Sequence, residues 1–539
     1  MKLIFVTGWV ISGLWKWITA ASIGTLLKSA WYNISIIKLD PYLNVDAGTM
    51  SPYEHGEVFV TDDGHETDLD LGHYSRFIDV PLSIDNSITT GKVYKRVLDK
   101  EREWAYLGDD IQVIPHVVNE VKEMILNVAK DYDILLVEIG GTIGDIEWPH
   151  FTEAARQLKR DLGKDNVLYI HVVLLLYLNF SKEFKTKPIQ HSYKELTRLG
   201  IQPDIMMCRS GFPIPQGVKE KISLFCNIDL PDIIENVNCE SIYQVPLQLQ
   251  RQNIDKIVQE KLWLTQKLCQ MENRNNRVAR LISAEKKVVI GMVGKYAAIQ
   301  DSYISVVESL KHACAAHGVK LILEWIHAED FEDEYKHLAV KDKIDGLIIP
   351  WGFGTRGMEG KIAAARFAME HQIPYLGLCL WLQMAVVAFA RYRCGLDDAH
   401  TVEAQRATQH PVITFMPWQH EELAKGGTMR LGAYDAILTP GTKVYELYKA
   451  HSDERVEQED GLLISERHRH RYEVNPLYVE VLQKNGLIMS GVNPYYGVVE
   501  FIELPDHPFF VATQAHPEFK SRLDKPHPLF WWLIEACVR

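Results

Sequence analysis

The sequence predicts an α/β protein of two domains, and three observations support this. Short runs of Val, Ile and Leu alternate with helical patterns through the first half, and a second series begins near residue 288. Most of these runs end in Gly, Asp or Glu, which is typical of parallel strands buried on both faces. A chain of 539 residues is also long enough for more than one domain. Ligands are therefore expected beyond the carboxyl ends of the strands.

The composition restricts the possible classes of function. The chain is 47% hydrophobic and 24% charged, with a formal net charge of −13, which is ordinary for a globular protein. The acidic balance argues against a nucleic-acid-binding protein. The 8 cysteines show no Cys-x-x-Cys spacing, so a reducing cytoplasm fits better than a disulfide framework or a zinc site. No segment has the roughly 20 consecutive apolar residues of a membrane span.

The first predicted strand, residues 2–8, leads into a glycine-rich stretch that contains Gly8, Gly13 and Lys16. A strand followed by such a stretch predicts a phosphate-binding loop, since glycine lets the backbone approach the ligand closely. A secretory leader is the rival interpretation of this N-terminus, but Lys16 interrupts its apolar part. Further strands are expected in the segments 34–40, 133–141, 167–177 and 203–210. Together they define an N-terminal P-loop-type, Rossmann-like domain over residues 1–266.

Residues 267–287 are polar and lack a strand pattern, so they are interpreted as a linker with some helix. The second α/β domain is expected over residues 288–539, with strands in the segments 287–296, 345–354, 373–381, 461–466 and 508–519. In "GLCLWLQ", Cys379 stands where a strand meets a helical pattern, which predicts a nucleophile elbow. His516 and Glu518 follow the last predicted strand and offer a base with an orienting carboxylate.

Two acidic residues of the first half, Asp70 and Glu138, stand at predicted strand ends. Such a pair can hold Mg²⁺ beside the phosphates of ATP, with Lys16 as a counter-charge. Taken alone, the pair is more often a set of helix caps or solvated acids. The segment "KTKPIQ" groups Lys185, Lys187 and Gln190, and Lys221 follows later. A lysine pair is usually a solvated face, but these residues suit a second triphosphate as point charges.

Several motifs resemble known families. "GLCLWLQ" (377–383), "PWGFG" (350–354) and "HPEF" (516–519) resemble the class I glutamine amidotransferases. The segments 38–77, "IQVIPH" (111–116), "VEIGGTIGDIE" (137–147), "KTKPIQHS" (185–192), "GGTMRLG" (426–432) and "ERHRHRYEVN" (466–475) resemble the CTP synthase family. This resemblance covers nearly the whole chain. It implies ATP-dependent amination of UTP with ammonia from glutamine, transferred internally, in a cytoplasmic homotetramer that GTP activates and CTP inhibits.

The resemblance also implies site residues. ATP is expected at Ser12, Gly13, Leu14, Trp15, Lys16, Trp17, Ile18 and Asp70, and Mg²⁺ at Asp70 and Glu138. UTP, or CTP as inhibitor, is expected at Ser12, Asp145, Ile146, Glu147, Lys185, Thr186, Lys187, Pro188, Ile189, Gln190 and Lys221. Glutamine is expected at Gly352, Leu380, Gln383, Glu403 and Arg471, with Arg469 as the alternative to Arg471. Arg356 and Arg430 are expected on segments that respond to GTP, and Lys38 and His55 are weaker candidates for the amination site.

The chain departs from the family pattern at tryptophans. Trp9, Trp15, Trp17, Trp351 and Trp381 stand where the family has glycine. A tryptophan at positive φ costs on the order of 1–3 kcal/mol, and an indole fills space near the phosphates and behind the elbow. We therefore expect a retained fold with damaged activity.

Two alternatives follow from this departure and from the shared domain types. One is a catalytically dead subunit that still assembles into tetramers or filaments. The other is an amidoligase with a different acceptor, against which "KTKPIQHS" and "GDIE" argue.

Overall fold

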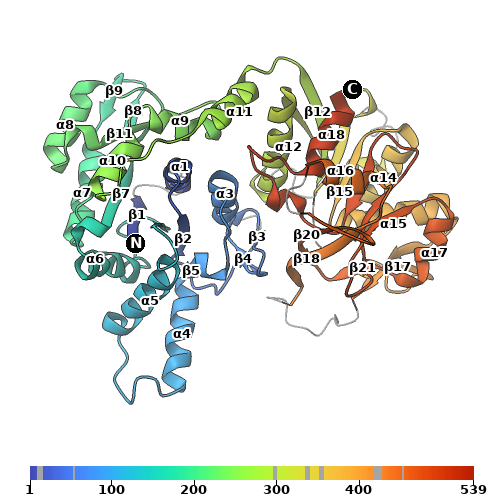
Figure 1. Ribbon diagram of the computed structural model, residues 1–539, viewed down its shortest axis with the longest axis horizontal. Helices are drawn as coiled ribbons and strands as arrows, with labels where there is room; N and C mark the ends of the chain where they lie inside the picture. Colours follow the sequence, from blue (N-terminus) through green and yellow to red (C-terminus); the bar gives the residue numbers. More distant parts are fainter. Residues whose placement is uncertain are drawn as a thin grey trace. The chain divides into compact units, whose positions relative to one another are not determined.

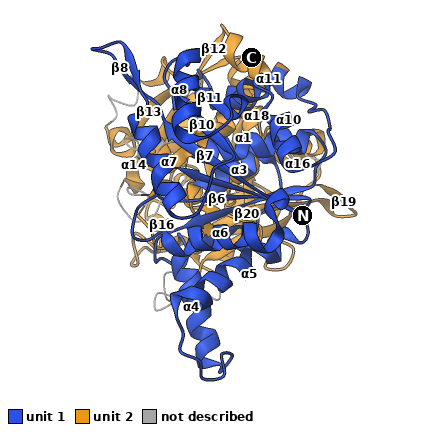
Figure 2. Ribbon diagram, turned by 90° about the vertical axis from the view of Figure 1, so that its left-hand side faces the viewer, with its two compact units in different colours: residues 1–47, 70–275 blue, residues 48–69, 276–539 orange. Residues whose placement is uncertain are grey.

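The computed structural model describes residues 1–8, 16–51, 55–294, 300–333, 340–350, 357–416, 428–451 and 455–538. The chain forms two compact units, coloured separately in Figure 2. Unit 1 comprises residues 1–47 and 70–275, and unit 2 comprises residues 48–69 and 276–539. The expected first domain, 1–266, thus includes a segment, 48–69, that packs with unit 2. The expected linker contains a helix, α11 (Glu272–Ser283).

Unit 1 is built on a seven-stranded sheet in the order β11-β10-β7-β1-β6-β2-β5, and its neighbouring strands are parallel. The strands are β1 (Lys2–Gly8), β2 (Ile34–Asp40), β5 (Ser87–Thr89), β6 (Ile134–Ile139), β7 (Val167–Leu174), β10 (Ile205–Ser210) and β11 (Ile233–Val237). The five strands predicted in this half are confirmed. A hairpin of β8 (Leu176–Leu178) and β9 (Glu183–Lys185) follows β7. Figure 1 labels these elements except β6 and β10, which are labelled in Figure 2.

Most helices of unit 1 connect its parallel strands, and the last two follow β11. The helices are α1 (Lys16–Ser29), α3 (Leu69–Ile78), α4 (Thr90–Arg102), α5 (Val118–Ala129), α6 (Pro149–Leu162), α7 (Lys187–Arg198), α8 (Gln216–Cys226), α9 (Val245–Gln250) and α10 (Ile254–Lys261). The central strands are apolar on both faces because helices cover both. In β1, for example, Leu3, Ile4, Phe5 and Val6 are fully buried.

Unit 2 has a ten-stranded sheet in the order β13-β12-β14-β15-β24-β23-β22-β18-β20-β19. Its parallel part contains β12 (Lys287–Gly294), β13 (Lys320–His327), β14 (Gly346–Ile349), β15 (Tyr375–Leu378) and β24 (Phe510–Thr513). The antiparallel part continues with β18 (Arg430–Leu438), β19 (Val456–Gln458), β20 (Gly461–His470), β22 (Ile488–Val492) and β23 (Val499–Glu503). The α/β class predicted for this half is confirmed.

Smaller elements complete unit 2. A three-stranded sheet joins β16 (Ala399–Thr401), β17 (His410–Phe415) and β21 (Tyr472–Val474). The helices are α12 (Ile304–His317), α14 (Met358–His371), α15 (Leu380–Arg393), α16 (Lys443–His451), α17 (Pro476–Lys484) and α18 (Pro528–Val538). Among the described residues of both units, no helix combines the length and apolar character that crossing a membrane requires.

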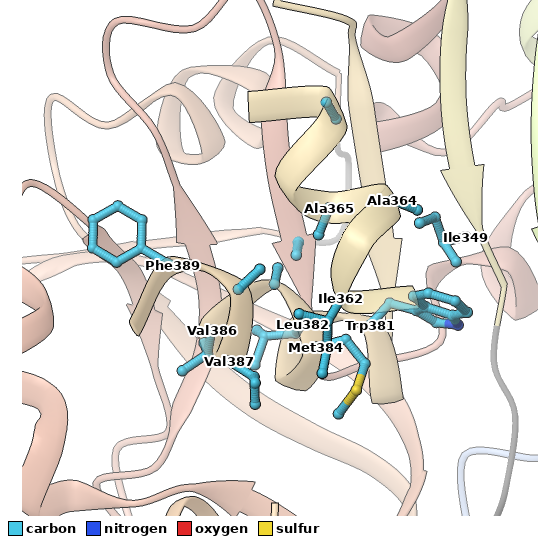
Figure 3. Packing of buried hydrophobic residues seen from close by; sticks show 14 of the residues in the cluster. Ile349, Ile362, Ala364, Ala365, Trp381, Leu382, Met384, Val386, Val387 and Phe389 are labelled. Carbon is cyan, nitrogen blue, oxygen red and sulfur yellow. The ribbon is translucent and has the colours of Figure 1, made fainter. Parts of the chain in front are cut away.

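Trp381 is accommodated in the core of unit 2 (Figure 3). Its side chain is fully buried, and its indole N–H donates to the carbonyl of Pro350. The ammonium of Lys361 lies 4.9 Å from the ring centroid, a cation–π distance. The expected disruption of packing behind the elbow is therefore not seen. Trp17 lies within α1 and stacks on His73 at 3.8 Å.

Positive φ does occur at tryptophans, but at three other positions. Trp31, Trp104 and Trp263 have φ of 61°, 62° and 53°. They follow the ends of α1, α4 and α10, where helices often continue into a left-handed residue, usually glycine. Their side chains are 73%, 67% and 78% exposed, so little packing offsets the backbone strain.

We expect replacement of each of these tryptophans by glycine to stabilise unit 1 by about 1 kcal/mol, because glycine adopts positive φ without a Cβ clash. Urea unfolding followed by circular dichroism measures the change. The matched control is alanine at the same positions, which removes the ring but keeps the clash. Equal gains for glycine and alanine would show that the ring, and not the backbone, is the source of strain.

Candidate active sites

Cys379 lies at the turn between β15 and α15, with φ of 58° and ψ of −109°. A positive φ at a residue with a Cβ is strained, and a strained strand-to-helix turn is the geometry of a nucleophile elbow. Its backbone N–H donates to the carbonyl of Thr513 at 2.7 Å, which anchors the turn on β24. The predicted nucleophile and the strand that precedes the predicted base are therefore neighbours in the sheet.

His516 and Glu518 form a buried pair beside this turn. Nδ1 of His516 lies 2.7 Å from a carboxylate oxygen of Glu518, and the two residues are 2% and 0% exposed. Among described residues, Nε2 of His516 has no hydrogen-bond partner of ordinary geometry. Burial lowers the pKa of His516, but the negative charges of Glu518 and Cys379 outweigh it and raise that pKa to about 10. The imidazole is thus held as a cation next to the sulfur.

The raised pKa of His516 predicts the pH dependence of the glutamine hydrolysis that the resemblance implies. An imidazolium can give its proton to departing ammonia, and this form persists until the pH rises through about 10. We therefore expect activity to be retained well above pH 6.5, the ordinary pKa of histidine, and to fall near pH 10. Glutamate release over pH 6–11 measures this. Recovery of activity after return to pH 8 controls for denaturation, and a reversible alkaline loss near pH 7 would contradict the expectation.

The predicted glutamine-binding residues surround the elbow in part. Leu380 begins α15, so its N–H lies at a helix N-terminus. The amide nitrogen of Gln383 donates to the carbonyl of Tyr472 at 2.9 Å. Glu403 lies half-buried in a turn after β16. Gly352 lies outside the described residues, as do Trp351 and Arg356.

The structure separates the two candidate arginines. Nη2 of Arg471 donates to the hydroxyl of Thr428 at 2.7 Å. Arg469 instead forms an ion pair with Glu66 at 2.8 Å, and both partners are buried. The guanidinium of Arg469 is therefore committed to residues 48–69, which leaves Arg471 as the better candidate for glutamine.

Arg430 does not lie where a nucleotide from solvent could contact it. The residue is 1% exposed, and its guanidinium pairs with Glu473 at 3.0 Å and with Glu500 at 2.5 Å. That Arg430 lies on a segment that responds to GTP stays a prediction. Burial raises the pKa of both glutamates and, with the charge of Arg430, lowers that of His468 and His470 well below 6.5. The arginine lies on β18 and is part of a buried network that includes His468 and His470 of the neighbouring strand β20.

In unit 1, Lys38 joins the two predicted metal ligands. Lys38 and Glu138 are direct neighbours on β2 and β6, and their charged atoms lie 3.4 Å apart. The ammonium also contacts Asp70, and Asp40 lies 3.8 Å away. Burial lowers the pKa of Lys38, but Asp70 and Glu138 raise it well above its usual value. Two carboxylates from remote parts of unit 1 therefore converge on one cation.

This donor set fits Mg²⁺. Carboxylate oxygens are its preferred protein ligands, and the position of the Lys38 ammonium shows that Asp70 and Glu138 can both face one positive charge. The described residues contain no cluster of three or more His, Cys, Asp or Glu arranged to hold a metal. The protein would thus contribute two ligands, and phosphate oxygens and water the others. The hydroxyl of Tyr74 donates to Glu138 and fixes its orientation.

Lys16, the first residue of α1, lies in the same neighbourhood. Its ammonium donates to the carbonyl of Gly141. Burial lowers the pKa of Lys16 to about 8, although Glu138 opposes this shift. The other predicted loop residues, Ser12, Gly13, Leu14 and Trp15, lie outside the described residues together with Trp9. The side chain of Ile18 is fully buried and packs in the core, and its place in the ATP site stays a prediction.

Two of the predicted UTP-binding lysines share one surface. Lys185 pairs with Glu183 at 2.6 Å on β9, and the charges of both Lys185 and Lys221 lower the pKa of Glu183. Lys187 is exposed at the start of α7, and Gln190 donates to the hydroxyl of Thr186 at 3.1 Å. Pro188 is half-buried beside them.

Other predicted UTP-binding residues differ in their exposure. Ile189 is fully buried, so only its backbone is available as a contact, and its place in the site stays a prediction. Asp145, Ile146 and Glu147 are exposed in the turn before α6. The structure brings Asp70 and Glu138 together, whereas Lys185 pairs with Glu183 at the hairpin.

His171 was not predicted as a site residue. It lies on β7 and connects β1 with α7. Its Nδ1 lies 2.9 Å from the hydroxyl of Thr7 at the end of β1, and its Nε2 lies 2.5 Å from that of Ser192 on α7. Burial and the charge of Lys16 lower the pKa of His171 to about 3, so the ring is neutral. A lone polar residue inside the apolar run "LYIHVV" was the available signal. Gln514 was also missed, and its amide nitrogen lies 3.9 Å from the sulfur of Cys379.

The elbow and its buried His–Glu pair on this sheet define unit 2 as a glutamine amidotransferase domain. A family model described as glutamine amidotransferase class-I matches residues 298–536, and one described as CTP synthase N-terminus matches residues 2–264. The chain therefore belongs to the CTP synthase family.

Relatives over the whole chain agree with this assignment. Proteins named CTP synthase from Methanococcus maripaludis and Methanocaldococcus jannaschii are each 52% identical over 543 residues, covering 100% of this chain and 100% and 98% of their own. The one from Bacillus subtilis is 49% identical over 539 residues, covering 100% of this chain and 98% of its own. A solved Trypanosoma brucei CTPS glutaminase domain with bound acivicin is 35% identical, with a TM-score of 0.42, covering 47% of this chain and 94% of that one.

Proposed function

We propose that this chain aminates UTP to CTP, using ATP and the ammonia that it releases from glutamine. The observation that carries the proposal is similarity over the full length to proteins named CTP synthase, at 49–52% identity. The local chemistry of both units supports it. Unit 2 offers a thiol with a charged imidazole, and unit 1 offers lysines and carboxylates suited to nucleoside triphosphates.

Cys379 attacks the amide carbon of glutamine, and the N–H of Leu380 stabilises the developing oxyanion. Nε2 of His516 gives its proton to the departing ammonia, which leaves a thioester on the sulfur. Water then hydrolyses the thioester to glutamate and restores the thiol. Glu518 orients the imidazole throughout, since it holds Nδ1 at 2.7 Å. Arg471 and Glu403 hold the ends of the substrate.

In unit 1, ATP phosphorylates the O4 oxygen of the UTP base. Ammonia then attacks C4, the carbon that bears this oxygen, and phosphate leaves. Asp70 and Glu138 would hold Mg²⁺, which neutralises charge on the transferred phosphoryl group. Lys16 adds a second positive charge at that group. Lys185, Lys187, Lys221 and Gln190 bind the triphosphate of UTP, and CTP competes there as an inhibitor. Family membership further supports activation by GTP near Arg356 and a homotetramer that can form filaments.

The test is CTP formation from UTP and ATP, measured by chromatography with glutamine and with ammonia as separate nitrogen donors. Turnover with both donors supports the proposal. Turnover with ammonia alone places a defect in unit 2. Turnover with neither, and no ATP binding by calorimetry, supports the alternative of an assembly subunit. Turnover with another acceptor in place of UTP supports a different amidoligase.

The alternative of impaired activity is tested by comparing the turnover of the wild type with that of a variant in which tryptophans are replaced by glycine. Activity regained by the double variant Trp15→Gly, Trp17→Gly would show that these residues damage the ATP site. An unchanged rate would show that they do not.

A further inference from the structure

Residues 48–69 belong to unit 2, although the chain on both sides of them belongs to unit 1. We call them the bridging segment. They contain a small hairpin of β3 (Phe59–Val60) and β4 (Glu66–Thr67). The segment is tied to unit 2 by its backbone, since Ala433 donates to the carbonyl of Asp62 at 2.8 Å. The next residue after it, Asp70, is one of the carboxylates that meet Lys38 in unit 1.

Two arginines of β20 hold the bridging segment. Nε of Arg467 contacts Asp62 at 2.6 Å, and its Nη1 donates to the carbonyl of Val60 at 3.1 Å. Nε of Arg469 contacts Glu66 at 2.8 Å. The two arginine side chains are only 5% and 8% exposed. Charge-assisted hydrogen bonds at such burial are strong and directional.

The backbone of the same two arginines meets the catalytic pair. The carbonyl of Arg467 accepts from the backbone N–H of His516 at 2.7 Å. The carbonyl of Arg469 lies 3.7 Å from the sulfur of Cys379. Because alternate residues of a strand share a face, Arg467 and Arg469 act together on the bridging segment. Any shift of their side chains along the strand would move the two carbonyls that contact the catalytic residues.

An aromatic contact reinforces this connection. The ring of Phe59 meets that of Phe519 at 4.9 Å, edge to face. Phe519 in turn stacks on the imidazole of His516 at 5.1 Å, with an interplanar angle of 10°. The bridging segment therefore reaches His516 both through Arg467 and through a ring pair.

We propose that Arg467 and Arg469 are positioning residues, through which the bridging segment sets the geometry of Cys379 and His516. Glutamine hydrolysis then depends on where the segment lies, and the segment's last residue adjoins the carboxylate Asp70. This inference rests on the proposed glutaminase activity of unit 2. It assigns a role in that activity to Asp62 and Glu66, which touch no catalytic residue themselves.

The test uses the full-length variants Asp62→Asn and Glu66→Gln, which remove charge but keep shape. The control is Glu370→Gln, which breaks an ion pair of similar length on α14, Arg366–Glu370 at 2.7 Å, whose side chains are 45% and 47% exposed. We expect kcat for glutamine hydrolysis to fall about tenfold or more in the first two variants. CTP formation from ammonia should match that of the control. Equal losses with both donors, or no loss, would overturn the proposal.

A second measurement does not need turnover. The rate at which iodoacetamide alkylates Cys379, followed by mass spectrometry of its peptide, reports the environment of the sulfur. We expect this rate to change at least threefold in Asp62→Asn and Glu66→Gln but not in Glu370→Gln. If the wild type hydrolyses no glutamine, the proposed function fails, and the alkylation rates still decide: equal rates in all variants reject the positioning role.

Discussion

Replacing Cys379 by alanine is expected to lower glutamine-dependent CTP formation by at least about 10³-fold, because no other group can form the thioester. The thiol lies at a strained turn, beside an imidazole that is held charged. Ammonia-dependent CTP formation should stay near that of the wild type, since free ammonia bypasses hydrolysis. Parallel assays with the two nitrogen donors measure both rates.

The control for this variant is Cys394→Ala. Cys394 is the C-cap of α15, the helix that Cys379 precedes, so the control alters a thiol on the same element. It should retain both activities. Loss of ammonia-dependent activity in Cys379→Ala would contradict a role confined to glutamine hydrolysis. Substantial glutamine-dependent activity in that variant would remove Cys379 as the nucleophile.

The sequence was most informative where the end of a single strand fixes the position of a site residue. Apolar runs that end in Gly or a charged residue located most parallel strands of both units, although β5, β11 and β13 were not predicted. Cys379 and His516 followed from the ends of two of the predicted strands. Those two strands, β15 and β24, are neighbours in the sheet. This explains why Cys379 and His516, which are 137 positions apart in sequence, can share a site. The antiparallel strands β18, β22 and β23 were not predicted. In β18, buried and half-buried residues mix without a long apolar run, which leaves a weaker pattern.

Pairing between remote side chains was harder to foresee. Lys38 was only a weak candidate, yet its place beside Glu138 follows from the register of β2 on β6. Arg430 was expected on a segment that responds to GTP, and its burial with two glutamates was not foreseen. A charged residue in a motif gives no sign of its burial, because buried partners come from distant strands. For the same reason, the assignment of the bridging segment to unit 2 could not be predicted from the sequence. Its arginine partners lie about 400 residues later in the chain.

Replacing Glu138 by glutamine is expected to lower CTP formation roughly 10²-fold or more with either nitrogen donor. Glu138 is 1% exposed, it accepts a hydrogen bond from Tyr74, and it faces the Lys38 ammonium at 3.4 Å. An amide keeps the size of the carboxylate but cannot balance a cation beside ATP. Both nitrogen donors should be affected equally, because the change lies in the phosphoryl-transfer unit. Glutamate release without nucleotides should persist, since Cys379 is untouched.

The matched control is Glu120→Gln in the same unit. Glu120 is 2% exposed and pairs with Arg96 and Lys100, each at 2.6 Å, so its loss also breaks a buried carboxylate network. Breaking such a network destabilises a fold by roughly 3–5 kcal/mol in strong cases, and both variants share that effect. Calorimetry of ATP with Mg²⁺ then separates them: binding should weaken in Glu138→Gln and persist in Glu120→Gln. Equal behaviour of the two variants would mean that Glu138 supports only the fold.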